Sequence, residues 1–447
     1  MSQDSPIKAY FWQLSKAVVS FITVVLISNT LGAHGRGQLS LYLLYLQVVL
    51  MINEIFAGSA MSNWFAQYGF QQLIARLSKI SLLILTIAAL LAEYFIPAKT
   101  TIWMLLWLLG LGLTWQNMVI NYFQAQQFIG LRNRWQFSFE LMKFLFIILI
   151  FAIPYLVFND LISFKLLYAF DILQWFLILS AASAWIWGFQ AFFKLRSLGA
   201  WNKSQETQAA NLSLREHSSQ GFLAQMGHLV LFFIYKTPLL ILSNGTFKSL
   251  SEVGVLTNVL LIADTVWIFG NSFGMVLHSK ALNNSNLQRQ NKWAALYSTI
   301  SFWVTLTLVF LIFVVPGDVY TWVFGRDFST MKGRLILITP GILALAVSAP
   351  LGHLLHARNR FLKLLANHSI AWATMLMVSG LFFYDQIECI SLNPFWLLMG
   401  LNAALLVVLL SNLKSLKLIK YFLLRFPVNT LITCRLVVKF LRVRKSR

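Results

Sequence analysis

Long runs of apolar residues constrain this chain more than any other feature. Residues 293–317 and 390–413 contain no charged side chain, and residues 11–34 contain one, Lys16. An α-helix rises about 1.5 Å per residue, so about 20 apolar residues cross the hydrocarbon core of a bilayer. Hydrophobic residues make up 58% of the 447 residues and charged residues only 11%, which leaves too little polar surface for a soluble globule of this length. The sequence therefore predicts an all-α polytopic membrane protein.

Polar clusters and Pro and Gly residues divide these runs into about twelve predicted transmembrane helices. The first run is far longer than the core of a signal peptide and lacks a small-residue cleavage site, so we expect it to be retained. The predicted spans are residues 8–30, 38–62, 79–97, 101–124, 136–158, 164–192, 221–243, 253–278, 293–315, 333–355, 363–384 and 393–413.

A polar stretch separates these spans into two equal sets. Residues 193–220 are poor in large apolar side chains and are predicted to form a flexible cytoplasmic linker. The expected organisation is an N-terminal lobe of six spans in residues 1–192, a C-terminal lobe of six spans in residues 221–413 and a basic cytoplasmic tail in residues 414–447.

The distribution of Lys and Arg indicates the orientation, because cytoplasmic loops retain these residues. If both termini are cytoplasmic, the N-terminus and the cytoplasmic loops hold fifteen of them, the opposite loops seven and the tail ten. The net charge of +21 is therefore largely a signature of topology, and it does not indicate nucleic-acid binding.

The tail carries basic residues on one helical face and apolar residues on the other. This pattern is typical of an amphipathic helix lying on an anionic leaflet. A disordered basic end that charge holds near the membrane is the alternative. The residues concerned are Arg435, Lys439 and Arg442 on one face, and Leu436, Val437, Phe440 and Leu441 on the other.

Motifs of metal, redox and hydrolytic chemistry find no support in the sequence. Cys389 and Cys434 fall on opposite sides of the membrane in the predicted topology, and no Cys/His spacing suits a metal. The G-x-S-x-G motif at 270–274 lies within an apolar helical run, so it predicts close helix packing and not an esterase. His353 and His356 are expected to form an interfacial polar pair. We therefore expect no cofactor, no metal and no enzymatic activity.

Three glycines punctuate residues 28–47, SNTLGAHGRGQLSLYLLYLQ, between the first two predicted spans. Gly32, Gly35 and Gly37 follow the order G-x-x-G-x-G after a helix, whereas a dinucleotide fingerprint has the order G-x-G-x-x-G after a strand. Glycine permits the left-handed backbone that ends one helix and starts the next. The stretch is therefore predicted to be an extracytoplasmic loop that reverses the chain direction.

Two stretches of the sequence carry a family resemblance. The first is L-G-A-H-G-R-G-Q-L at 31–39, and the second is a short F-G-x-x-F loop, a mid-helix Pro-Gly and an L-x-A-x-N-R exit within 323–360. Together with the span count, they resemble the polysaccharide flippases, which transport lipid-linked O-antigen and other repeat units. The residues at the second match are Phe324, Gly325, Phe328, Pro340, Gly341, Leu355, Ala357, Asn359 and Arg360.

This resemblance implies a fold and a function. The family belongs to a superfamily that includes the multidrug and toxin extrusion (MATE) exporters, so a MATE-like fold of two six-helix lobes is expected. The implied function is alternating-access translocation of polyprenyl-pyrophosphate oligosaccharides across the bacterial cytoplasmic (inner) membrane, for lipopolysaccharide or other surface polysaccharide. The implied partners are the lipid-linked oligosaccharide, a polysaccharide polymerase and a chain-length regulator.

Charged side chains inside the predicted spans are the candidate functional residues, because a charge at the bilayer midplane costs at least about 2.5–3.5 kcal/mol on insertion scales. The resemblance implies that the lysines among them hold the pyrophosphate, and that the carboxylates bind a coupling proton or cation. The lysines are Lys16, Lys143 and Lys236; the carboxylates are Glu54 and Asp264 first, then Glu140 and Asp171.

Structural roles for these charges stay open. Glu140 and Lys143 are three residues apart on one helix face, so they could neutralise each other. Asp171 could lie high enough in its span to reach solvent.

Three rival functions are also open. A cation-coupled multidrug exporter shares the fold class but should have an acidic cavity. An integral-membrane polymerase needs a large extracytoplasmic loop with clustered Arg, Asp or His, whereas the longest outside loop, 316–332, is short. A major-facilitator transporter should have a basic, Gly/Asp-rich loop after its second span, which residues 63–78 do not match.

Overall fold

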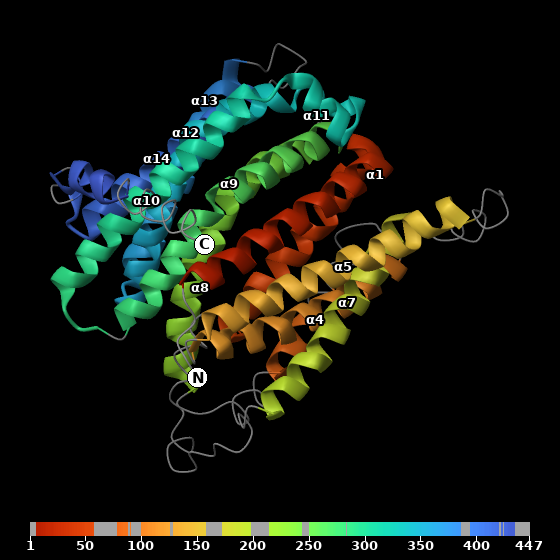
Figure 1. Ribbon diagram of the computed structural model, residues 1–447, viewed down its shortest axis with the longest axis horizontal. Helices are drawn as coiled ribbons and strands as arrows, with labels where there is room; N and C mark the ends of the chain where they lie inside the picture. Colours follow the sequence, from red (N-terminus) through yellow and green to blue (C-terminus); the bar gives the residue numbers. More distant parts are fainter. Residues whose placement is uncertain are drawn as a thin grey trace, which may run out of the picture. The chain divides into compact units, whose positions relative to one another are not determined.

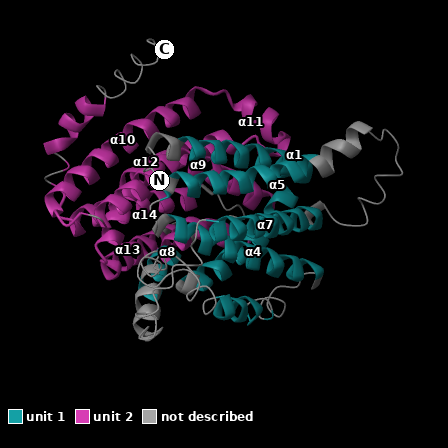
Figure 2. Cartoon of the chain, turned by 60° about the horizontal axis from the view of Figure 1, so that its bottom comes forward, with its two compact units in different colours: residues 1–229 teal, residues 230–447 magenta. Residues whose placement is uncertain are grey.

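The computed structural model confirms the all-α prediction, since every regular element among the described residues is helical (Figure 1). The chain divides into two compact units, Met1–Leu229 and Val230–Arg447 (Figure 2), and the boundary falls within helix α8. The residues that the structure describes are 6–57, 78–87, 90, 100–125, 128–157, 172–197, 214–243, 250–282, 284–385, 394–419, 422 and 424–433.

Most of the predicted spans correspond to long apolar helices. Nine stretches among the described residues are long and apolar enough to cross a membrane. One of them, Phe11–Glu54, has 44 residues, about twice the length that a single crossing needs. A shorter apolar helix, Ser78–Ile87, covers the start of the predicted third span, most of whose remainder lies outside the described residues.

Helix α1 (Pro6–Ala57) consists of two helices that meet at Gly32. Gly32 has φ 63° and ψ −177°, a left-handed φ that glycine adopts without the steric cost of a Cβ. The predicted turn is therefore present, but the prediction of a loop built on three glycines is wrong, because Gly35 and Gly37 lie within helix. A single residue with this backbone conformation is enough to interrupt the helical hydrogen bonds.

The two halves of α1 pack on different helices of unit 1. In the first half, the Trp12 ring contacts Phe137 of α5 (Ile129–Val157) with centroids 5.3 Å apart. In the second half, the Tyr45 ring contacts Trp103 of α4 (Thr100–Ala125) at 5.1 Å. Each half thus has its own partner helix, as expected for two separate crossings.

Aromatic residues and glycines close the core of unit 1. Trp187 on α7 (Ile172–Ser197) is fully buried, and its Nε1 donates to the Trp135 carbonyl oxygen at 2.6 Å. A Cβ at Gly188 would overlap the Trp115 ring of α4, whose Nε1 donates to the Gly188 carbonyl oxygen at 3.1 Å. Close backbone approach at a glycine therefore joins α4 to α7, as is common in membrane helix packing.

Helix α12 (Met331–Ala357) lies at the centre of unit 2 and packs on three of its helices: α9 (Leu250–Leu282), α10 (Leu287–Val314) and α14 (Pro394–Ser415). Helix α8 (Leu214–Ser243) precedes α9, and α13 (Phe361–Asp385) packs on α14. The short helices α11 (Gly317–Phe324) and η3 (Arg326–Phe328) connect α10 to α12.

The mid-helix Pro-Gly of α12 is supported by one side chain of α14. Pro340 cannot donate a backbone hydrogen bond, and its ring disturbs the preceding turn of the helix. Backbone groups left without helical partners at such a break need other partners inside a membrane. Asn402 supplies both kinds of bond: its Oδ1 accepts from the Gly341 N–H at 2.8 Å, and its Nδ2 donates to the Leu337 carbonyl oxygen at 2.6 Å.

The described part of the C-terminal tail packs on the middle of α10. Trp303 Nε1 donates to Thr430 Oγ1 at 3.0 Å, and the Phe426 ring lies 5.5 Å from that of Phe302. Asn429 is buried, whereas the Leu431 side chain is 65% exposed. The exposed side chains of this segment are mainly apolar, with Arg425 as an exposed charge among them, so lipid suits this face better than water.

Several predicted features fall wholly or partly outside the described residues. They are the linker residues 198–213, Asp171, Cys389, Cys434 and the basic helix at 435–442. Helices α7 and α8 extend into the predicted linker from its two ends.

Candidate functional site

The intramembrane charges predicted from the sequence form three groups among the described residues. Two groups belong to unit 1 and one to unit 2, and each combines residues from at least two helices. The groups are Lys16 with Glu140 and Lys143, Glu54 with Asn117 and Gln225, and Lys236 with Asp264.

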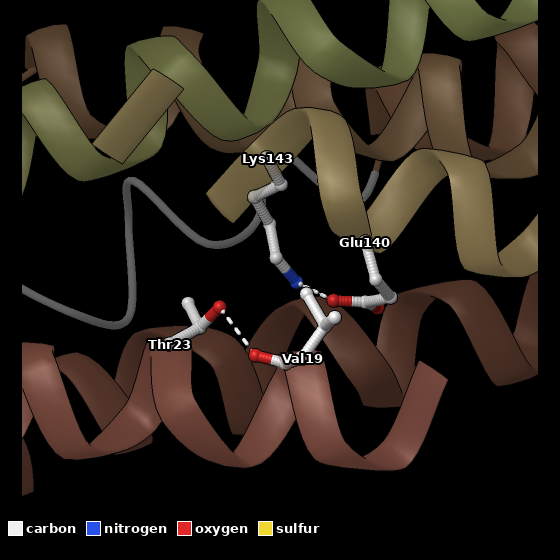
Figure 3. Close-up of polar contacts among 4 residues, drawn as sticks. All are labelled: Val19, Thr23, Glu140 and Lys143. Atoms are coloured by element: carbon white, nitrogen blue, oxygen red, sulfur yellow. Dashed lines mark hydrogen bonds and ion pairs between the residues drawn. The ribbon is translucent and has the colours of Figure 1, made fainter. Parts of the chain in front are cut away.

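The first group, which we call the cationic cluster, lies between α1 and α5. Lys143 Nζ is 2.5 Å from Glu140 Oε2, and both side chains are largely buried. Figure 3 shows Lys143 reaching from α5 toward the stretch of α1 that carries Val19 and Thr23. The spacing of three residues within one helix explains this ion pair, as the sequence indicates.

Lys16 gives the cationic cluster a surplus of positive charge. The half-buried Lys16 lies within electrostatic range of Glu140, Lys143 and Arg132. The electrostatic environment of Lys16 therefore contains two further cationic side chains and a single carboxylate. An excess of cationic over anionic side chains among the described residues of an apolar helix pair favours binding of an anion.

The second group, which we call the Glu54 cradle, holds a carboxylate between neutral amides. Asn117 Nδ2 of α4 donates to Glu54 Oε1 at 2.9 Å, and Gln225 Nε2 of α8 donates to Glu54 Oε2 at 2.9 Å. The neighbouring Asn53 donates from Nδ2 to Thr114 Oγ1 at 2.8 Å. Two helices, α4 and α8, therefore converge on Glu54 of α1 with hydrogen-bonding side chains.

The Glu54 cradle has the composition of a site for a proton or a small cation. Both hydrogen-bond partners of the Glu54 carboxylate are neutral amides, and none of its contacts among the described residues is an ion pair. Carboxylate and amide oxygens are ligands that hard cations prefer. The sequence singled out Glu54 by its charge but not Asn117 or Gln225, since uncharged amides at these depths carry no signal of their own.

The third group lies in unit 2 between α8 and α9. Asp264 Oδ1 accepts a hydrogen bond from Trp267 Nε1 at 3.0 Å, and Lys236 is within electrostatic range of Asp264. The Tyr235 ring stacks on that of Trp267, with centroids 6.5 Å apart. The positive charge of Lys236 is thus balanced by the negative charge of Asp264 in the same unit, whereas the cationic cluster carries an excess of positive charge.

Two motifs noted in the sequence have structural positions in α9 and α12. Ser272 Oγ donates to the Ile268 carbonyl oxygen at 2.8 Å, and a Cβ at Gly270 would overlap Ala346. The motif at 270–274 is therefore a helix-packing element, as predicted. The prediction that His353 and His356 form an interfacial pair is wrong, because His356 is buried against a different partner, His278.

Comparisons with known proteins establish the fold. No protein-family model matches the sequence, and no curated protein matches it. The structure is similar to that of the eukaryotic MATE transporter AtDTX14, with a TM-score of 0.68 at 14% identity over 96% of this chain and 98% of that one. A mutant of the Vibrio cholerae MATE transporter VcmN matches with a TM-score of 0.67 at 11% identity, over 94% of this chain and 98% of that one.

A flippase has a similar structure as well. The lipid II flippase MurJ, in its inward closed conformation, matches with a TM-score of 0.60 at 13% identity over 97% of this chain and 93% of that one. These similarities extend over nearly the full length of each protein. The chain therefore has the all-α, MATE-like fold that these exporters and this flippase share.

Proposed function

We propose that this protein is an alternating-access transporter that translocates polyprenyl-pyrophosphate-linked oligosaccharides across the bacterial inner membrane. The MATE-like fold supports transport or flipping by alternating access, since it is the fold of both MATE exporters and a lipid II flippase. Its neighbours are transporters, which supports a transport function over an enzymatic one.

The observation that carries the choice of substrate is the charge of the cationic cluster. Lys16 lies within electrostatic range of Lys143, Arg132 and the single carboxylate of Glu140, which pairs with Lys143, so the group favours an anion. A pyrophosphate brings about two negative charges into a region of low dielectric, where nearby cations offset the cost of its desolvation. Lys16 is the residue proposed to contact it first, because Lys143 is already engaged by Glu140.

The two remaining groups are proposed to serve coupling. Glu54 has amide neighbours but no cationic partner among the described residues, so a proton or sodium ion would complete its charge balance. Asp264 lies beside Lys236, so binding of a proton there would release the lysine to act on the substrate phosphate.

The surface polysaccharide polymerase and chain-length regulator are the partners expected to use the exported units.

A second candidate function is cation-coupled export of drugs. The Glu54 cradle favours it, because a carboxylate held by neutral amides, with no basic partner in the described part of the chain, attracts organic cations as well as inorganic ones. The MATE neighbours are the fold-level support for this alternative.

Reconstitution separates the two functions. The purified protein is placed in liposomes with a fluorescent polyprenyl-pyrophosphate oligosaccharide or with a cationic dye, and movement across the bilayer is followed for each. We expect flipping of the lipid-linked sugar, and Lys16→Gln should reduce it at least about tenfold by removing a charge-assisted phosphate contact. The matched control is Lys194→Gln at the exposed end of α7, which should keep full activity. Transport of the dye alone would instead establish the exporter function.

A further inference from the structure

Three histidines from two helices meet inside unit 2. His278 Nε2 of α9 lies 3.1 Å from His356 Nδ1 of α12, and the two side chains are only 4% and 5% exposed. The His353 ring of α12 lies 6.2 Å from that of His278, centroid to centroid. His353 Nε2 in turn is 2.8 Å from Asn271 Oδ1. We call these four residues the histidine cluster.

The packing around the histidine cluster is specific. A Cβ at Gly274 would overlap the His353 ring, so only glycine at this position of α9 admits the imidazole. The His356 ring meets the edge of Phe361 with centroids 4.9 Å apart. Burying three imidazoles carries a desolvation cost. Apolar residues would fill the same space without this cost, so packing alone does not explain the histidines.

Helical geometry aligns the histidine cluster with Asp264. Asp264, Asn271 and His278 occur at seven-residue intervals on α9, which places them on one face at steps of about 10 Å, or two turns. Asp264 lies toward the middle of the predicted span, and His278 lies at its cytoplasmic end. Hydrogen-bonding groups therefore extend from that end of unit 2 toward the carboxylate.

The charged side chains that follow the histidine cluster on its own described helices, and those at the neighbouring helix ends, are basic. Lys280 follows on α9, and Arg358 follows on α12, where its guanidinium bonds Gln290 and Asn291 of α10. Burial, and next the charge of Arg360, lower the pKa of Arg358 from its ordinary value. The neighbouring ends of the other helices add the basic residues Arg289 and Lys292 on α10, Lys363 on α13, and Lys414 with Lys417 after it on α14.

This surrounding charge disfavours a stored positive charge on the imidazoles. No carboxylate occurs in the sequence from 265 to 317, or from 328 to 384, to compensate one. The histidines are therefore suited to passing a proton on and not to holding it. In a neutral pair, one ring nitrogen donates and the other accepts, so a proton added at the outer nitrogen of one ring is balanced by release of a proton from the other ring.

We propose that His278, His356 and His353 with Asn271 form a proton-conducting path between the cytoplasmic end of unit 2 and Asp264, with water completing the step from Asn271 to the carboxylate. The inference rests on the coupling role proposed for Asp264. It goes further by naming the proton as the coupling ion of unit 2 and the cytoplasm as the side with which Asp264 exchanges it. Imidazole is suited to this task because its unperturbed pKa lies near neutrality.

Time-resolved infrared spectroscopy tests the path without any transported substrate. The full-length protein in lipid nanodiscs is subjected to a pH jump, and the carboxylic acid band of Asp264 is identified by its loss in Asp264→Asn. We expect His278→Gln/His356→Gln to slow the protonation of Asp264 by at least about tenfold, as expected when positioned proton carriers are removed. Gly274→Ala should also slow it, because it displaces His353 without removing a titratable group.

The control is His368→Gln, which removes another buried imidazole from unit 2 and should leave the rate unchanged. Thermal unfolding of each variant identifies any that fail to fold. If the double variant fails to fold, the protonation rate of Gly274→Ala still tests the path. Equal protonation rates in the wild type and both pathway variants would overturn the path while leaving Asp264 as a coupling residue. An Asp264 band that never responds to pH in the wild type would overturn the coupling role, and the path with it.

Discussion

Asn117 on α4 donates a hydrogen bond to Glu54 at the C-terminal end of α1, with 2.9 Å between Nδ2 and Oε1. Gln225 holds the other carboxylate oxygen at the same distance. Both oxygens are thus held by neutral donors, which orient the carboxylate but do not cancel its charge. Uptake or loss of a cation at Glu54 would therefore change the local electrostatics of unit 1 more than at the paired Glu140.

Glu54→Gln should uncouple transport from its driving ion while preserving the fold. The glutamine has the shape of the carboxylate and can still accept from one amide, but it binds neither a proton nor a cation at neutral pH. We expect gradient-driven transport in liposomes to fall at least about tenfold, as expected when a functional intramembrane charge is removed. Counterflow, which needs no driving ion, should persist.

Glu54→Asp provides the comparison for this variant. It keeps the charge but shortens the side chain, so partial driven transport is expected. Wild-type driven transport in Glu54→Gln would contradict the coupling role.

The sequence could predict the helices but not the partners within them. Apolar runs such as 293–315 correspond closely to α10, because a membrane requires long uncharged helices whatever their neighbours. The ion pair of Glu140 with Lys143 also follows from spacing, since both residues lie on one helix. By contrast, Gln225 lies 171 residues from Glu54 in the chain. Which helix packs on which decides such a contact, and this is not encoded in local periodicity.

The ion pair of the cationic cluster should show strong energetic coupling. Lys143→Ala leaves Glu140 largely buried beside only Lys16 and Arg132, and Glu140→Ala leaves three cations together. The double variant removes both the unpaired carboxylate and the excess cation. Its loss of unfolding free energy should therefore be smaller than the sum of the losses in the two single variants. A double-mutant cycle on unfolding in mild detergent should give an interaction free energy of about 0.5–3 kcal/mol, the range for contacting pairs. Additive effects would show that the pair contributes nothing.

Gly32→Ala should destabilise the turn between the two halves of α1. Its φ of 63° and ψ of −177° fall in a region essentially restricted to glycine, so a residue with a Cβ there costs about 1–3 kcal/mol. Gly380 in α13 has open space around its missing Cβ, so Gly380→Ala should be neutral or stabilising by up to about 1 kcal/mol through helix propensity. Thermal unfolding of the two variants should therefore shift in opposite directions. A neutral Gly32→Ala would exclude this backbone conformation.

Asn402→Leu should weaken the packing of α14 on α12. The substitution keeps the approximate side-chain volume but removes both hydrogen bonds to the backbone around Pro340, those of the Gly341 N–H and the Leu337 carbonyl. A buried polar group left without a partner costs about 1–3 kcal/mol. Hydrogen exchange should therefore increase at Gly341 before it increases elsewhere in α12. Asn402→Asp keeps the acceptor for Gly341 and should protect that amide better than leucine does.

The described part of the tail, residues 422 and 424–433, should lie in lipid. Leu424 and Leu431 are 77% and 65% exposed, whereas Asn429 and Thr433 are buried, and the Trp303–Thr430 bond joins this segment to the middle of α10. A spin label at 431, in a variant whose two native cysteines are replaced, should therefore collide with oxygen dissolved in the bilayer and not with a water-soluble nickel complex. A label at Lys417, which is exposed just beyond α14, should show the reverse. Thr430→Val removes the hydrogen bond at nearly constant volume, and it should loosen the segment and increase motion of the label at 431. A label at 431 that is accessible to the nickel complex would place the segment at the aqueous surface, where its outward leucines would have no apolar surroundings.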